Sequence, residues 1–124
     1  MEKINIKGTE DSPSIILDKE NSLFKIYGCS IPSNSEKIYG SVIDWFNRYL
    51  LEQNDITVLD FELDYFNTST QKYLADLFKI INAKRDKTKT LKVLWKYPSD
   101  DEDMKMIGKQ FEQFVDFNFE FIES

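Results

Sequence analysis

The chain has 124 residues, of which 41% are hydrophobic, enough apolar material for the core of one domain. Its 22 acidic and 16 basic side chains give a net charge of −6, which opposes binding to nucleic-acid phosphates and to anionic lipid surfaces. With no histidine and one cysteine, it lacks the residues for a Ser-His-Asp or Cys-His catalytic group, a histidine metal cluster or an internal disulfide. We therefore expect a single acidic, soluble domain over residues 1–124, with neither nucleic acid nor membrane as a partner.

The N-terminal sequence indicates a cytoplasmic location. Residues 1–5 lack the basic stretch and the following apolar run of a secretory signal. Charged residues also interrupt every apolar cluster well before the ~20 residues that a membrane-spanning helix needs.

The first half of the chain predicts a hairpin, a helix and a strand. Residues 14–17 and 23–28 are rich in strand-forming residues and flank the polar segment 18–21, as in an antiparallel hairpin. After Pro32, the sequence from Ser33 to Glu36 matches a capping box, and apolar residues then recur at helical spacing to residue 50. Residues 56–65 alternate between apolar and polar, which predicts a half-buried strand.

The second half predicts two more helix and strand pairs. Apolar spacing over 74–81 predicts a helix that ends in the basic stretch 84–89, and residues 91–97 alternate as a strand. Ser99 to Glu102 matches a second capping box before a helix over 104–114, and residues 117–121 form a last alternating strand. The order β-β-α-β-α-β-α-β predicts an α/β (α+β) fold, a mixed sheet with about three helices mainly on one face, because several strands keep a polar face.

Three carboxylates form a stripe on the polar face of the strand over 56–65. Asp60, Glu62 and Asp64 are oxygen ligands of the kind that magnesium prefers. Lys92 and Lys96 occupy the equivalent face of an expected neighbouring strand, so pairing of opposite charges across the strands explains the stripe without a metal. A carboxylate-based enzyme or metal-binding domain remains the alternative hypothesis.

Four small polar residues, Asn67 to Thr70, separate this strand from the next helix. In one interpretation Thr68 is the N-cap and Gln71 returns the hydrogen bond as a capping box. In the other, a hydroxyl at a helix N-terminus is placed for phosphorylation. The phosphate adds about −1.5 to −2 charge, which the helix N-terminus tolerates and a docked partner does not. The residues alone leave both interpretations open.

The segment 59–69, LDFELDYFNTS, resembles the strand and Asn-Thr-Ser-Ser loop of the SiaC family of bacterial regulatory phosphoproteins. Gly8-Thr9 and the segment 12–15 are similar to the family's opening. The next block of matching residues is Gly28, Ser30, Pro32, Asn34, Ser35, Tyr39, Trp45, Tyr49 and Leu50. The chain departs from the family pattern at Thr70, which replaces the second loop serine, and at Ser33, where glutamate is common.

The resemblance implies a fold like that of STAS domains and a non-enzymatic role without cofactor or metal. It implies that a serine/threonine kinase phosphorylates Thr68 and that a PP2C-type phosphatase restores it, while Asn67, Ser69 and Thr70 form the rest of the loop. Ser69 and Thr70 are the competing acceptors. The unphosphorylated protein is then expected to bind an effector such as a diguanylate cyclase and to activate cyclic di-GMP synthesis. A STAS-like module that binds a small molecule is a third hypothesis, although no glycine-rich phosphate loop supports it.

Overall fold

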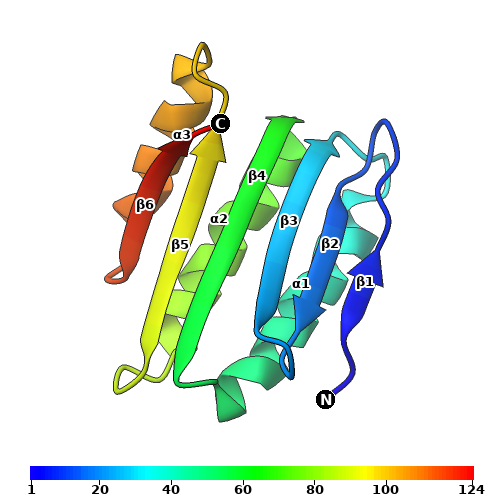
Figure 1. The fold of residues 1–124 in the computed structure, drawn as a ribbon. Coiled ribbons are helices and arrows are strands. Elements are labelled where there is room, and N and C mark those ends of the chain that lie inside the picture. Colours follow the sequence, from blue (N-terminus) through cyan, green and yellow to red (C-terminus); the bar gives the residue numbers. More distant parts are fainter.

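Six strands form one sheet, and their order across the sheet is the same as their order along the chain (Figure 1). In this computed structural model, which describes residues 1–124, β1, β2 and β3 pair antiparallel, and β3, β4, β5 and β6 pair parallel. The strands are β1 (Ile4–Ile6), β2 (Ser14–Asp18), β3 (Leu23–Ser30), β4 (Ile56–Phe66), β5 (Thr90–Tyr97) and β6 (Asn118–Glu123).

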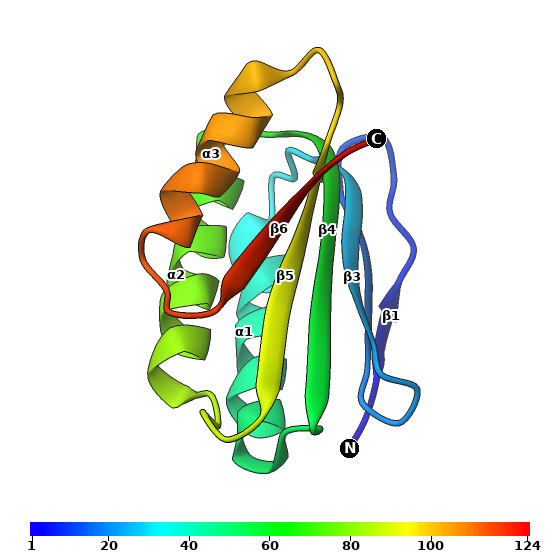
Figure 2. The ribbon, with the colours of Figure 1, turned by 60° about the vertical axis from the view of Figure 1, so that its left-hand side comes forward.

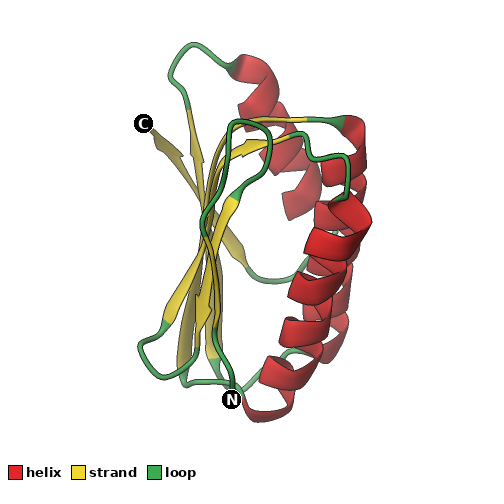
Figure 3. Ribbon diagram, turned by 90° about the vertical axis from the view of Figure 1, so that its right-hand side faces the viewer, coloured by secondary structure: helices red, strands yellow, loops and turns green.

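All three helices lie on the same face of this sheet (Figures 2 and 3). They are α1 (Ser35–Tyr49), α2 (Thr68–Lys84) and α3 (Glu102–Glu112), and a short 3₁₀ helix, η1 (Leu50–Glu52), follows α1. Each of the three connects two parallel strands, so the predicted mixed sheet with helices on one face is confirmed. None of these helices is both long and apolar enough to span a membrane.

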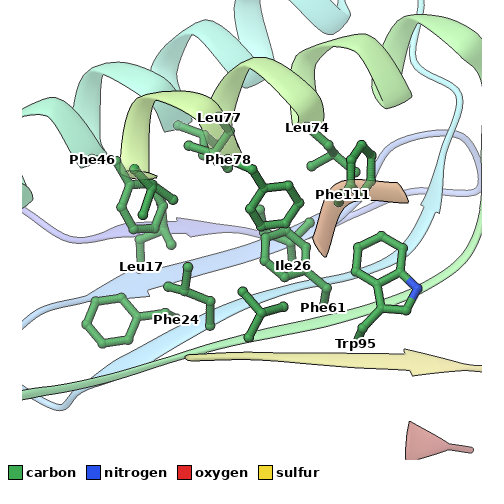
Figure 4. Close-up of a cluster of buried hydrophobic side chains, with 14 of the residues drawn as sticks. Leu17, Phe24, Ile26, Phe46, Phe61, Leu74, Leu77, Phe78, Trp95 and Phe111 are labelled. Atoms are coloured by element: carbon green, nitrogen blue, oxygen red, sulfur yellow. The ribbon is translucent and has the colours of Figure 1, made fainter. Parts of the chain in front are cut away.

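The hydrophobic core fills the space between the sheet and the helices (Figure 4). Every second residue of the central strands and every third or fourth residue of the helices points into it, as the apolar spacing predicts. Aromatic rings make up much of the core. Phe61 of β4 lies 5.2 Å from Phe78 of α2, and Trp95 of β5 lies 5.6 Å from Phe111 of α3, measured between ring centroids.

Ion pairs between strands occupy the open face of the sheet. Lys96 Nζ lies 3.0 Å from Asp60 Oδ2, and Lys25 Nζ lies 3.6 Å from Glu62 Oε1. The predicted pairing with a lysine of the neighbouring strand is therefore confirmed for Asp60, whereas Glu62 pairs with Lys25 of β3, on the other side of β4. No group of three histidine, cysteine or acidic side chains is arranged to hold a metal ion.

Lys92 has a different partner from the one that the sequence predicts. It pairs with Glu120 of β6, at 3.4 Å between Nζ and Oε2, rather than with the stripe on β4. The reason is that β5 lies between β4 and β6, so its lysines have acidic neighbours on both sides.

The two capping boxes predicted at Ser33 and Ser99 are wrong. The N-cap of α1 is Asn34, whose side chain makes no capping hydrogen bond. The N-cap of α3 is Asp101, whose Oδ1 accepts a hydrogen bond from the backbone N–H of Met104 at 3.0 Å. In these clusters of Ser, Asn and Asp residues, the helix begins one residue later than Ser33 predicts and two residues later than Ser99 predicts.

A β-bulge changes the side-chain alternation of β4 just before the predicted loop. Gly28 of β3 pairs with Leu63, but Cys29 pairs with Tyr65, so Asp64 is an extra residue. The bulge points Phe66 into the core, where it is 8% exposed, and leaves Tyr65 60% exposed. Asn67, the residue after Phe66, therefore lies at the start of α2.

Candidate functional site

The site lies at the edge of the sheet where the parallel strands end and the three helices begin (Figures 1 and 3). The loop Asn67 to Thr70 connects β4 to α2 at this edge. Because Ser30 ends β3 beside Phe66, the loop lies against the segment that leads into α1.

Asn67, and not Thr68, is the N-cap of α2. Its Oδ1 accepts a hydrogen bond from the backbone N–H of Thr70 at 2.9 Å. Its own N–H donates to the carbonyl of Ser30 at 3.2 Å, which fixes the loop to the end of β3. The predicted Thr68–Gln71 capping box is thus wrong, because Thr68 is already the first helical residue.

Thr68 has an exposed side chain, and its hydroxyl makes no hydrogen bond with the rest of the chain. As the first and second residues of the helix, Thr68 and Ser69 also have backbone N–H groups without intrahelical acceptors. These N–H groups and the helix dipole favour a negative charge at this place. The arrangement suits a phosphate on Thr68 without disturbing the core.

Thr70, by contrast, is completely buried. Its Oγ1 donates to the carbonyl of Ser30 at 2.9 Å, and it lies 2.9 Å from Ser30 Oγ, which in turn lies 2.6 Å from the hydroxyl of Tyr39. Since each hydroxyl has one proton, Ser30 donates to Thr70 and Tyr39 donates to Ser30. The Thr70 hydroxyl therefore joins α2 to β3 and α1 and is closed to a kinase.

Burial raises the pKa of Tyr39 to about 12, although the neighbouring hydroxyl groups of Ser30 and Thr70 act in the opposite direction. The phenol is therefore neutral and able to donate its proton over the physiological pH range. This state keeps the hydroxyl network complete.

Ser69 is exposed, but its hydroxyl has a partner. Ser69 Oγ lies 2.8 Å from Ser35 Oγ, and Ser35 Oγ donates to the carbonyl of Pro32 at 3.3 Å. Ser69 therefore donates to Ser35 and connects the N-terminus of α2 to that of α1. Of the three neighbouring hydroxyls, only that of Thr68 is both exposed and unpaired.

Cys29 lies near this edge but does not contribute a nucleophile. Its side chain is half-buried, and burial raises the pKa of its thiol, with Asp11 and Asp64 adding to the effect. A thiolate is therefore disfavoured. The structure gives the thiol no disulfide partner.

Sequence reasoning located the loop but missed the residues that organise it. Ser30 and Tyr39 matched the family pattern, but nothing in the sequence placed their hydroxyls against Thr70, which is 40 residues beyond Ser30. Ser35 was likewise missed as the partner of Ser69. The one local feature that points to this network is a buried serine at the end of a strand, and its burial is known only from the structure.

Comparisons with known proteins agree with this architecture. Residues 6–124 match the family described as SiaC family regulatory phosphoprotein. The chain belongs to the SiaC family. It is 29% identical over 119 residues to an uncharacterized protein of Pseudomonas aeruginosa (strain UCBPP-PA14), which covers 96% of this chain and 94% of that protein.

Solved structures of SiaC share the fold. SiaC of Pseudomonas aeruginosa is 27% identical to this chain, with a TM-score of 0.88 over the full length of both chains. A second similar structure is described as the diguanylate cyclase SiaD in complex with its activator SiaC, from the same organism. It gives 27% identity and a TM-score of 0.89 over 98% of this chain and 99% of that one. In that organism the SiaC protein is therefore an activator of a cyclase.

Proposed function

We propose that residues 1–124 act as one non-enzymatic SiaC-like domain that switches a partner protein in the bacterial cytoplasm. A serine/threonine kinase phosphorylates Thr68, and a PP2C-type phosphatase removes the phosphate. The unmodified protein binds and activates an effector, for which a diguanylate cyclase is our first candidate because a similar protein activates one. The phosphorylated protein releases it.

The observation that carries this proposal is the difference among the three hydroxyls of the loop. Thr68 is exposed and unpaired, Ser69 donates to Ser35, and Thr70 is buried in the network with Ser30. A kinase and a phosphatase both need access to the hydroxyl that they modify. Thr68 alone offers this access without breaking a hydrogen bond.

The physical effect of the phosphate differs between the free protein and a complex. In the free protein the N–H groups of Thr68 and Ser69 stabilise the added charge of about −1.5 to −2, so the fold persists. In a complex, a partner that covers Thr68 must desolvate this charge or withdraw. Phosphorylation therefore changes binding far more than folding.

The acceptor can be identified by mass spectrometry on the protein isolated from its native host. Trypsin yields the peptide Tyr49 to Lys72, in which fragmentation distinguishes Thr68 from Ser69, Thr70 and Thr57. We expect phosphate on Thr68 alone.

Matched variants sharpen this test. Thr68→Ala should remove the phosphate, while Thr68→Ser and Ser69→Ala should retain it. Phosphate on Ser69, or an unchanged extent of phosphorylation in Thr68→Ala, would show that the acceptor is assigned to the wrong residue.

A further inference from the structure

A shallow polar cleft, open to solvent, lies between α1 and the first turns of α2, beside the loop that carries Thr68. Its volume is about 710 Å³. Ser69 and Tyr73 of α2 line one side, and the exposed stripe of α1 lines the other. The residues of this stripe that the cleft contains are Glu36, Lys37, Gly40, Ser41 and Asp44.

Gly40 is the unexpected member of this cleft. It lies in the interior of α1, where glycine is among the poorest helix formers. The other three glycines have internal reasons: Gly28 has a φ of +95°, and a Cβ on Gly8 or Gly108 would lie within 2.6 Å of a neighbouring atom. A Cβ on Gly40 would meet nothing within 4 Å.

The fold therefore does not require a glycine at position 40. An alanine there would project its methyl group into the cleft and would favour the helix. Glycine is the residue that permits the closest approach of a second backbone. We propose that Gly40 keeps the cleft open for a helix of the effector protein and that the cleft is the surface on which this effector docks.

The lining of the cleft determines the kind of segment that fits. Beyond the first turn, the backbone groups of α1 and α2 are paired inside the helices, so an extended strand has no row of partners here. The groove between two helices instead accepts the side-chain ridge of a third. Glu36, Lys37 and Asp44 form no ion pairs within the chain, so the cleft presents two free carboxylates against one ammonium group. The effector helix therefore presents polar side chains and a basic residue opposite Asp44.

This inference rests on the proposed function and specifies where the effector binds. Ser69 lines the cleft and directly follows Thr68, so a phosphate on Thr68 stands at its rim. Asp44 lies nine residues beyond Ser35, about 13 Å along α1. The attraction between Asp44 and the effector helix therefore acts at the opposite end of the cleft from the phosphate. A phosphate on Thr68 therefore blocks the end of the cleft where the effector helix would cover this residue.

The test measures stability and binding on the same variants, with calorimetric titration against the purified full-length diguanylate cyclase of the same genome that is most similar to SiaD. Gly40→Ala should raise the melting temperature by about 2–5 °C, because alanine favours the helix. It should nevertheless weaken binding by about fivefold, and Gly40→Leu by tenfold or more, because the added groups fill the cleft. Asp44→Lys should weaken binding as well.

Gly108→Ala is the matched control, since its added Cβ would lie 2.5 Å from Trp95 in the core. It should lower the melting temperature and leave the affinity of the folded protein unchanged. If the unmodified protein binds the cyclase and Gly40→Leu binds it equally well, the cleft is not the docking surface, while the proposed function stands. If the unmodified protein does not bind the cyclase, both proposals fail. A lower melting temperature in Gly40→Ala would assign Gly40 an internal role and overturn the inference.

Discussion

Three consecutive hydroxyl residues in one loop have three different environments. Thr68 faces solvent, Ser69 reaches across to α1, and Thr70 closes a buried network. The cap that positions them is Asn67, whose side chain satisfies one of the free N–H groups of α2. The residue that we propose as the phosphate acceptor is thus separate from the residue that caps the helix.

This separation predicts different stabilities for two alanine variants. Asn67→Ala should lower the free energy of unfolding by about 1 kcal/mol, because the N–H of Thr70 loses its acceptor. Thr68→Ala should change it by less than about 0.5 kcal/mol, because its hydroxyl has no partner. Urea unfolding at neutral pH measures both. A larger loss of unfolding free energy in Thr68→Ala than in Asn67→Ala would show that Thr68 is the N-cap.

At the scale of secondary-structure elements, buried hydroxyl groups connect α1, β3 and α2 at the carboxyl edge of the sheet. Tyr39 of α1, Ser30 of β3 and Thr70 of α2 form one chain of hydrogen bonds inside the hydrophobic core. Buried polar groups are costly when they lose a partner, so this network defines how α2 sits on the sheet. The loop with Thr68 is held in place by the same contacts.

The network predicts how stability depends on alkaline pH. Burial raises the pKa of Tyr39 to about 12 in the folded protein, against 10.0 for the ordinary phenol, so the unfolded chain releases this proton first. The contribution of Tyr39 is complete below pH ~10 and falls as the pH rises toward ~12. Urea unfolding between pH 9 and 11.5 should therefore show a decline in stability that is shallower in Tyr39→Phe.

The same variant should lose about 1 kcal/mol at pH 7, because Ser30 loses its donor. Part of the alkaline decline should remain in Tyr39→Phe, since burial also raises the pKa of Tyr49. An identical slope in the two proteins would mean that Tyr39 does not titrate differently on unfolding.

The main elements could be predicted because their apolar residues recur with the period of a strand or a helix. β1 could not, because an edge strand of three residues has too few positions to show a period. The caps were misassigned because Ser, Thr, Asn and Asp occur together, and only the backbone decides which of them precedes the helix. The loop itself was found, but its hydrogen-bond partners lie on other elements and no local pattern reveals them.

At the scale of the whole molecule, the two faces of the sheet differ in their roles. The helices cover one face (Figure 3), and ion pairs such as Lys96–Asp60 neutralise charges on the other. The exposed, unpaired polar groups of the loop and the cleft gather at the edge where the helices begin. In the proposed switch, one phosphate on Thr68 would change this binding surface without rearranging the core.

The most direct test of the central claim compares the unmodified protein with the same protein phosphorylated at Thr68. The affinity for the diguanylate cyclase and the rate of cyclic di-GMP synthesis are measured for both forms. We predict that the unmodified form binds and raises the rate, that the phosphorylated form binds at least about tenfold more weakly, and that a PP2C-type phosphatase restores binding. Equal affinity and equal activation by the two forms would contradict the switch.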